Sequence, residues 1–212
     1  LRDSPHCLLV GEGAEAFARS RELAFRSDFP SEARKAVWRK HLASIVDPER
    51  IEGEDLAALG GVLGEQDEAA EIAAGLGMPA TEGDTVGACA FDASGRAGAA
   101  VSTGGIWLKM PGRVGDVPLP GAGLWVAPDG SGAAVATGTG ESLLRTLLCR
   151  ELVDRLAELG PGGAAEAAIE LLTAETGPGQ GGVISVSGRG VGYGLSTRGM
   201  GRAAWTAGMD EP

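Results

Sequence analysis

The residues of this sequence that could carry out catalysis are mainly threonines beside glycine-rich turns. Thr85 follows Asp84 directly, Thr103 lies in VSTGG, and Thr137 lies in ATGTGE. Threonine is a weak nucleophile, but as the first residue of a chain it has its own α-amine beside the hydroxyl as a base. Breakage of the Asp84–Thr85 bond would create such a nucleophile. The alternative is that Thr85 is an ordinary β-branched residue at the start of a strand.

Other catalytic motifs are absent from the sequence. It contains no GxSxG, HExxH or GxxxxGK motif, and because no GK follows TGTGE, we do not expect a phosphate loop there. His6 and His41 are the only histidines and stand far apart, which disfavours a histidine zinc site or a Ser-His-Asp triad. The three cysteines give no disulfide framework, and we expect Cys89 to be a small buried hydrophobic residue.

Composition limits the class of protein. The 212 residues are enough for one sizeable domain, and 43% of them are hydrophobic. The net charge of −11 argues against nucleic acid and anionic membrane surfaces as partners. No apolar run is long enough for a membrane span, and no secretory signal is present, so we expect a cytoplasmic protein. We expect Trp38, Trp125 and Trp205 in the core or at interfaces.

The chain is organised in three zones. Residues 1–46 are predicted to be helical, because GEGAEAFARSRELAF and SEARKAVWRKHLASIV space apolar residues between charges. Residues 47–84 are acidic and rich in glycine and alanine, which indicates a linker. Residues 85–212 alternate strand-like and helix-like segments.

The third zone contains two predicted hairpins and two predicted helices. TVGACAF and GRAGAAVSTGG form the first hairpin around DASG, and GGVISVS and VGYGLST form the second around SGRG. Between them lie the short strand SGAAVATG, the helix ESLLRTLLCRELVDRLAEL, which we expect Gly160 and Pro161 to stop, and the helix GGAAEAAIELLTAET. This order predicts helices stacked on antiparallel sheets.

Five motifs in a fixed order resemble one known family. GDTVGACAF, STGG, GRVGD, GAG and TGTGE resemble the β-subunit core of the plant-type asparaginase, isoaspartyl peptidase and glycosylasparaginase family. PHCLLVGEGAEAFA and ARKAVWRKHL resemble the second half of that family's α subunit, so the resemblance covers residues 5–46 and 83–205. It implies a four-layer αββα N-terminal-nucleophile hydrolase fold. Residues 1–84 would then be part of the α subunit and residues 85–212 the catalytic β subunit of one composite domain.

The resemblance also implies roles for individual residues. Thr85 matches the nucleophile, released by autocleavage after Asp84, and Thr103 matches the second threonine that contacts and tunes it. Thr137 and Gly138 match the oxyanion hole, and Gly138 also belongs to the substrate-binding set.

Two charged residues of GRVGD match the substrate-binding groups. Arg113 would clamp the substrate α-carboxylate with its bidentate fork, and Asp116 would receive the α-ammonium. The alternative is that Arg113 and Asp116, three residues apart, simply pair with each other on a loop.

The implied function is that of an autoprocessed amidohydrolase. It would cleave the side-chain amide of L-asparagine, of β-aspartyl (isoaspartyl) dipeptides, or of both, and release aspartate. One alternative is a glycosylasparaginase, because Asp84 stands where asparaginases of this type usually have glycine. TGTGE favours the asparaginase branch instead. The other alternative is an uncleaved, non-catalytic homologue.

The resemblance gives further expectations about partners and cofactors. We expect a small-molecule substrate, a homodimer of αβ units, no cofactor and no metal. The family's α subunit opens with strands before the PHCLLVGEGA segment, and the sequence lacks them. The loop that binds a structural sodium ion in the asparaginase branch lies in that missing part.

Overall fold

The computed structural model describes residues 8–23, 32, 85–106, 109, 112–197 and 199–206. The chain divides into two compact units, Leu1–Glu52 and Gly53–Pro212. The predicted linker at 47–84 lies outside the described residues, as does the predicted helix at 31–46 apart from Glu32, which is helical.

Helix α1 (Gly11–Ser20) belongs to the first unit and confirms most of the helix predicted there. Glu12 lies in its first turn and Arg19 in its last, the arrangement that the helix dipole favours. Arg19 also forms an ion pair with Glu15 one turn earlier. The helix ends sooner than predicted because Glu22 adopts a left-handed φ of 55°.

The hairpin of the second unit opens with β1 (Val86–Phe91) and returns as β2 (Ala97–Ser102), as predicted. The two strands are antiparallel, with Val86 opposite Ser102 at their open end. Asp92 shapes the turn, because its Oδ1 accepts hydrogen bonds from the backbone N–H groups of Ser94 and Arg96.

A second, four-stranded antiparallel sheet has the order β3-β4-β5-β6. Its strands are β3 (Leu124–Val126), β4 (Gly132–Gly138), β5 (Gly181–Ser187) and β6 (Gly190–Leu195). The predicted strand SGAAVATG and the second hairpin are confirmed as β4 and β5–β6. Strand β3 was not predicted, because three residues are too short to show an alternating pattern.

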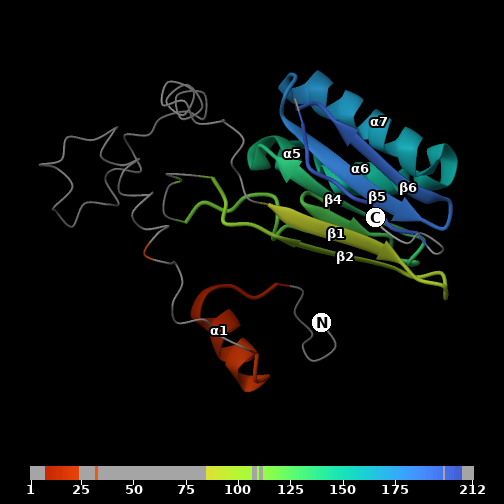
Figure 1. Ribbon diagram of the computed structural model, residues 1–212. Coiled ribbons are helices and arrows are strands. Elements are labelled where there is room, and N and C mark those ends of the chain that lie inside the picture. Colours follow the sequence, from red (N-terminus) through yellow and green to blue (C-terminus); the bar gives the residue numbers. More distant parts are fainter. Residues whose placement is uncertain are drawn as a thin grey trace, which may run out of the picture. The chain divides into compact units, whose positions relative to one another are not determined.

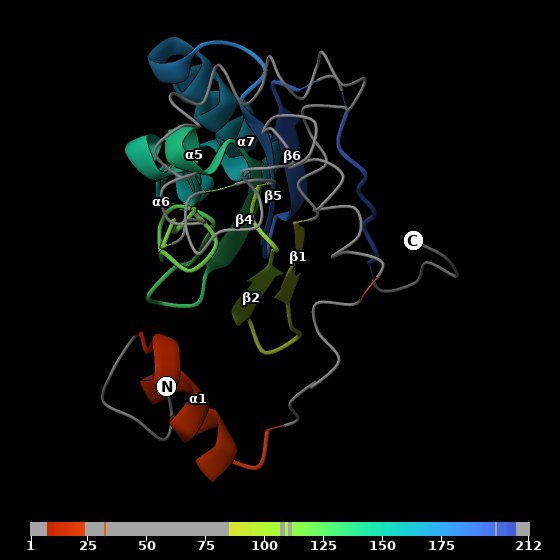
Figure 2. The same ribbon diagram turned by 90° about the vertical axis from the view of Figure 1, so that its left-hand side faces the viewer.

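The helices α5 (Gly140–Thr146), α6 (Leu148–Asp154) and α7 (Leu156–Thr176) cover one face of this sheet. Helix α6 packs on β3 and β4, and α7 packs on β5 and β6. The β1–β2 hairpin packs on the opposite face, mainly over β4 (Figures 1 and 2). The described part of the second unit therefore forms three layers, helices on a four-stranded sheet on a two-stranded sheet.

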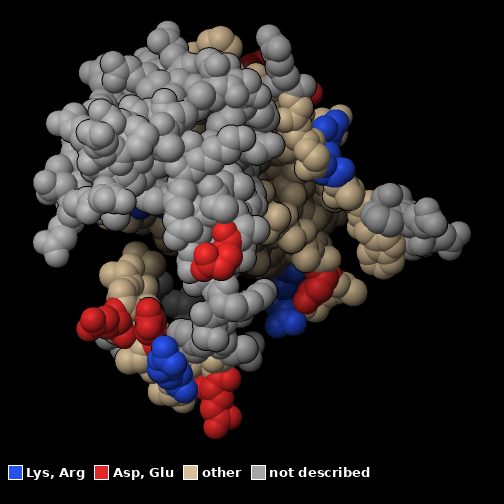
Figure 3. Space-filling view, turned by 60° about the vertical axis from the view of Figure 1, so that its left-hand side comes forward, with Lys and Arg blue, Asp and Glu red and all other residues tan. Residues whose placement is uncertain are grey.

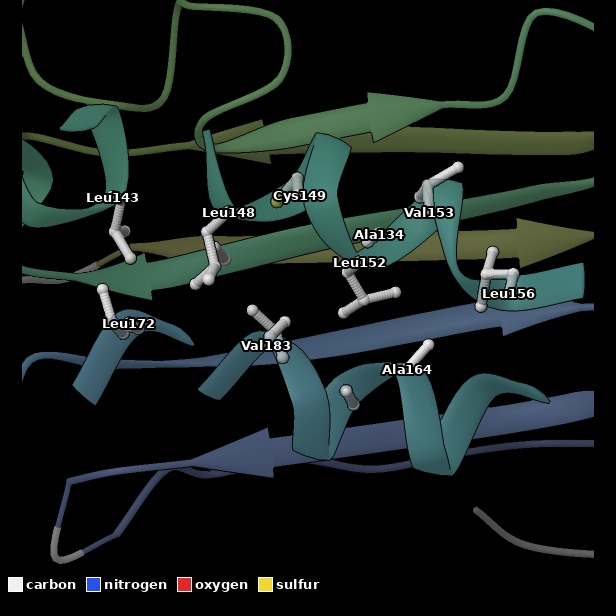
Figure 4. Packing of buried hydrophobic residues seen from close by; sticks show 13 residues of the cluster. Ala134, Leu143, Leu148, Cys149, Leu152, Val153, Leu156, Ala164, Leu172 and Val183 are labelled. Atoms are coloured by element: carbon white, nitrogen blue, oxygen red, sulfur yellow. The ribbon is translucent and has the colours of Figure 1, made fainter. Parts of the chain in front are cut away.

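The core lies between the helices and the four-stranded sheet. Leu143, Leu148, Leu152 and Leu172 are fully buried there, and Figure 4 shows them facing sheet residues such as Val183. Trp125 packs against this cluster, with the Arg150 guanidinium 5.2 Å from its ring centroid.

Of the other two tryptophans expected in the core or at interfaces, the structure describes only Trp205. Trp205 is 63% exposed, so the prediction of a core position is wrong for this residue, and an interface position is not tested. Trp38 lies outside the described residues.

The long helix predicted over ESLLRTLLCRELVDRLAEL is wrong as a single element. The chain leaves the helix at Leu147, which is left-handed with φ 47° and ψ 47°, and again at Arg155. The first break leaves Leu147 exposed and turns Leu148 into the core, so tertiary packing overrides the local helical preference. The predicted stop is confirmed, because Gly160 before Pro161 is non-helical inside α7.

Candidate active site

The β1–β2 hairpin brings Thr85 and Thr103 together. The two residues lie just beyond the paired ends Val86 and Ser102, so the register places them opposite each other. Thr85 Oγ1 donates a hydrogen bond of 3.0 Å to Thr103 Oγ1, which also accepts one of 3.0 Å from the Gly105 N–H. Both threonines are half-buried. The predicted contact between these hydroxyls is therefore present, although they are 18 residues apart in the chain.

Arg113 forms a bidentate ion pair with Glu141, in the first turn of α5. Arg113 Nε donates to Glu141 Oε1 and Arg113 Nη2 donates to Glu141 Oε2, each at 2.8 Å. The Arg113 side chain is 14% exposed, and the hydrogen bonds with Glu141 raise the pKa of its guanidinium. The suggested loop pair of Arg113 with Asp116 is not the pair formed, because the acidic partner comes from 28 residues further along the chain.

Asp116 is a buried carboxyl close to that ion pair. It is 7% exposed, and within the described part of the chain its buried Oδ2 has no hydrogen-bond partner. Burial raises the pKa of Asp116, and the nearby Arg113 opposes this rise. A buried carboxylate oxygen without a donor is costly, so Oδ2 is well suited to accept a donor from a bound cationic group.

Gly140 lets Arg113 and Asp116 meet at the start of α5. A Cβ atom on Gly140 would lie 2.7 Å from Arg113 Nη2 and 3.0 Å from Asp116 Oδ1. Arg113, Asp116 and Glu141 thus form one charged cluster, the guanidinium cluster. It contains one cation and two carboxyl groups.

Thr137 and Gly138 are the last two residues of strand β4. Helix α5, which carries Glu141 of the guanidinium cluster, begins two residues later. Gly138 has a φ of 152°, and a Cβ there would lie 2.2 Å from the Gln180 carbonyl oxygen, so only glycine fits. The Thr139 N–H donates to that same carbonyl oxygen at 2.8 Å, which fixes the turn between β4 and α5.

The first residues of β1 and the last residues of β4 lie at the same end of the sandwich, beside α5 (Figure 1). The close packing of Gly87 on Val135, where a Cβ would lie 3.0 Å from Val135 Cγ2, holds the two strands together near this end. The threonine pair, Thr137 with Gly138, and the guanidinium cluster therefore share one end of the second unit. Asp84 lies outside the described residues.

The sequence did not predict that Glu141, the first residue of the predicted helix ESLLRTLLCRELVDRLAEL, pairs with Arg113. The available signal was an acidic residue in the first turn of a helix that directly follows a TGTG turn. That signal does not name the partner, because the guanidinium comes from a distant loop.

The described cysteines do not compete with threonine as nucleophiles. Burial raises the pKa of Cys89 to about 11 and raises that of Cys149 well above its usual range, so both thiols stay protonated at neutral pH. Cys89 is half-buried, so the prediction of a small buried hydrophobic residue is confirmed only in part.

The described surface and helices show no feature of a polyanion-binding, membrane-spanning or metal-binding protein. On the face in Figure 3, acidic and basic side chains are interspersed, without gathering into a patch of one sign among the described residues. Among the described helices, none has the length and apolar character that a bilayer crossing requires. The described residues hold no group of three or more His, Cys, Asp or Glu side chains placed to bind a metal ion.

Comparisons with known proteins place the chain in a family. A family model described as asparaginase matches residues 1–211. The chain therefore belongs to the asparaginase family.

Curated relatives agree with this family. A plant-type L-asparaginase of Pyrobaculum calidifontis is 50% identical over 121 residues, covering 56% of this chain and 40% of the relative. A plant-type L-asparaginase of Pyrococcus abyssi is 37% identical over all of this chain and 64% of its own length. An isoaspartyl peptidase of Escherichia coli is 36% identical over all of this chain and 60% of its own length. The chain thus spans about three fifths of the relatives that it matches throughout.

Proposed function

We propose that this chain is an autoprocessed amidohydrolase that cleaves the side-chain amide of L-asparagine, of β-aspartyl dipeptides, or of both, with Thr85 as nucleophile. The relatives named L-asparaginase and isoaspartyl peptidase support the substrate class. The observation that carries the proposal is the 3.0 Å hydrogen bond between the Thr85 and Thr103 hydroxyls. It places a second hydroxyl where it can orient and tune an attacking oxygen.

The nucleophile has to be released first. Thr85 Oγ1 attacks the carbonyl carbon of Asp84, the C–N bond breaks, and the freed nitrogen takes the hydroxyl proton, which leaves an ester. Water then hydrolyses this ester, so that Asp84 ends one chain and Thr85 begins the next. The product carries an α-amine on the same residue as the nucleophilic hydroxyl.

Hydrolysis uses that amine as the base. Thr85 Oγ1 attacks the β-carbonyl carbon of the substrate while the α-amine takes its proton and then passes it to the leaving nitrogen. The Thr137 hydroxyl and the Gly138 N–H donate to the developing oxyanion. The C–N bond breaks to give a β-aspartyl ester on Thr85, which water hydrolyses to free aspartate.

The guanidinium cluster would hold the α-amino-acid end of the substrate. Arg113 binds the α-carboxylate through charge-assisted hydrogen bonds. Asp116 Oδ2, buried and without a partner among the described residues, accepts from the α-ammonium. The α-carbon is thereby fixed while the β-carbonyl reaches Thr85.

The proposal also includes the complete fold, the cofactor requirement, the oligomeric state and the cellular location. The full fold would be the four-layer αββα sandwich, of which the described residues form one helical and two sheet layers. The chemistry uses only hydroxyl, amine and backbone groups of the chain, so we expect it to need no cofactor. A homodimer of αβ units, one composite domain and a cytoplasmic location also remain predictions.

A substrate panel tests the proposal. The full chain is incubated with L-asparagine, a β-aspartyl dipeptide and an N4-glycosylated asparagine, and aspartate release is followed by an enzyme-coupled assay. We expect release from one or both of the first two. Release only from the glycosylated substrate would favour a glycosylasparaginase instead. A single uncleaved band on a denaturing gel without any aspartate release would favour the non-catalytic homologue.

A further inference from the structure

Glu141 occupies one edge of the Arg113 guanidinium. The two hydrogen bonds of 2.8 Å use Nε and one N–H of Nη2, so the side of the fork nearest the aliphatic stem is filled by a carboxylate. The planar guanidinium has five N–H donors, and three remain, two on Nη1 and one on Nη2. Within the described residues, no hydrogen bond from Nη1 to a protein acceptor is present, and Nη1 is not a buried unsatisfied atom.

Two glycines confine the same guanidinium. A Cβ on Gly115 would lie 2.6 Å from Arg113 Nη1, and a Cβ on Gly140 would lie 2.7 Å from Arg113 Nη2. The guanidinium therefore fits closely against both backbones, and the Glu141 carboxylate fixes its rotation about the last side-chain bonds. The edge of the fork that Glu141 leaves for a substrate carboxylate is its end, between Nη1 and Nη2.

The charges of the guanidinium cluster also limit what can bind. With Glu141 and Asp116 both ionised, these two carboxylates and the Arg113 guanidinium together carry a net charge of −1. A ligand with a carboxylate alone would add a second net negative charge to a largely buried site. A ligand with both an α-carboxylate and an α-ammonium adds none, and its ammonium would pair with the Asp116 carboxyl, whose buried Oδ2 has no hydrogen-bond partner among the described residues.

We propose that Glu141 is a positioning and specificity-determining residue, which orients Arg113 and offsets its charge so that a carboxylate binds well only together with an α-ammonium. This inference rests on the proposed function, because it concerns the α-amino-acid end of the same substrates. The chemistry that Glu141 excludes is that of monoamides of plain dicarboxylic acids, such as succinamate, which is asparagine without its amino group.

Two variants separate charge from geometry. Glu141→Gln removes the negative charge and turns one acceptor into a donor that faces Nη2 of Arg113. Glu141→Asp keeps the charge but shortens the side chain by one methylene, so the bidentate geometry is lost. We expect Glu141→Gln to change substrate preference, and Glu141→Asp to raise KM for both substrates alike while preference is kept.

A control variant exists in the same unit. Glu151 of α6 pairs with Arg155, the residue that directly follows this helix, in a similar Glu–Arg contact, and both side chains are more than a third exposed. Glu151→Gln removes the same charge from the same residue type outside the proposed site, and we expect it to leave substrate preference unchanged.

The experiment compares kcat/KM for L-asparagine and succinamate in the full chain and its variants. We expect the ratio to fall about tenfold in Glu141→Gln, mainly through KM, since one charge is removed beside a partly screened site. Calorimetry with L-aspartate and succinate measures the same preference without catalysis. An unchanged ratio, or an equal loss for both ligands, would overturn the role of Glu141.

The two proposals can fail separately. A wild-type chain that prefers aspartate to succinate in calorimetry, and loses that preference in Glu141→Gln, supports the inference even if it hydrolyses no amide, which would overturn the proposed function. If the chain hydrolyses asparagine but Glu141→Gln keeps the wild-type preference, the proposed function is supported and the inference about Glu141 is overturned. A wild-type chain that binds neither ligand and hydrolyses neither amide contradicts both proposals.

Discussion

The two sheets of the second unit are built from similar small residues but are buried very differently. Strands β4 and β5 are buried along most of their length between the helices and the hairpin. Strand β2 alternates between partly buried and exposed positions, and β1 is exposed over its first three residues before it alternates, with Val86 at its start 67% exposed. The difference arises because helices cover the outer face of the larger sheet, whereas no described residue packs a comparable layer over the hairpin.

Because of this difference, the residues that form most of the core and the proposed nucleophile lie in different layers. The helices and the larger sheet contribute the core, together with Thr137, Gly138 and Glu141 at its end. The hairpin contributes Thr85 and Thr103, and under the proposed cleavage its start would accommodate first a peptide bond and then a free chain end. The proposed oxyanion pair Thr137–Gly138 and Glu141 thus stand on the buried layer, whereas the proposed nucleophile stands on the less buried hairpin. Arg113 and Asp116 belong to neither layer, because they lie in the loop between β2 and β3.

The largest effect is expected at the start of the hairpin. Thr85→Ala removes the nucleophile for both processing and hydrolysis, so we expect an uncut chain and a loss of kcat of about 10³-fold or more. A denaturing gel and aspartate release measure the two effects. Thr85→Ser keeps a hydroxyl and should retain part of both activities, and full turnover by Thr85→Ala would refute the assignment.

Substitutions in the core between the helices and the larger sheet should lower the free energy of unfolding. Leu172→Ala empties a fully buried site between α7 and the larger sheet, and we expect a loss of about 2–5 kcal/mol in the free energy of unfolding. Val86→Ala, on the exposed start of β1, should change it by no more than about 0.5 kcal/mol. Urea unfolding measures both, and equal losses would mean that the hairpin carries as much of the core as the helical layer.

A smaller change is expected for the second hydroxyl of the hairpin. Thr103→Val keeps the shape of the side chain but removes the partner of Thr85 Oγ1, and we expect kcat to fall about tenfold to a hundredfold. The neighbouring exposed hydroxyl gives the control, because Ser102→Ala should leave kcat unchanged. If both variants lose the same activity, the effect belongs to the strand end rather than to the hydrogen bond.

The smallest effect concerns pH and Asp116. Burial raises the pKa of this carboxyl above 3.8, so folding favours its neutral form. Its contribution to stability is full below pH 3.8 and is lost as pH rises through the raised folded-state pKa. Asp116→Asn stays neutral, so its stability relative to the wild type should increase from acid to neutral pH. Thermal unfolding across this range measures the difference, and a constant difference would contradict the raised pKa.

Much of the fold follows from local sequence pattern. The two hairpins were predictable because alternating segments flank short turn sequences, and Asp92 and Gly160 act within a few residues of their own positions. The break at Leu147 was not predictable, because neither glycine nor proline marks it and its cause is the burial of Leu148 against the sheet. The three-residue strand β3 was missed because of its length.

The candidate site was also predictable only in part. The meeting of Thr85 with Thr103 follows from the hairpin register, so the sequence could predict it once the turn was placed. The ion pair of Arg113 with Glu141 joins a loop to a helix start, and no local pattern selects Glu141 over the nearer Asp116. Only the three-dimensional arrangement around Gly140 decides between these two carboxyl groups.

The central claim is that the hydroxyl and the α-amine of Thr85 act together after the bond to Asp84 is broken. Intact mass measurement with N-terminal sequencing of the purified, active full chain tests it most directly. We predict a second N-terminus that begins TVGACAF, in proportion to the measured activity. Full amide hydrolysis by material in which Asp84 and Thr85 are still joined would contradict the account.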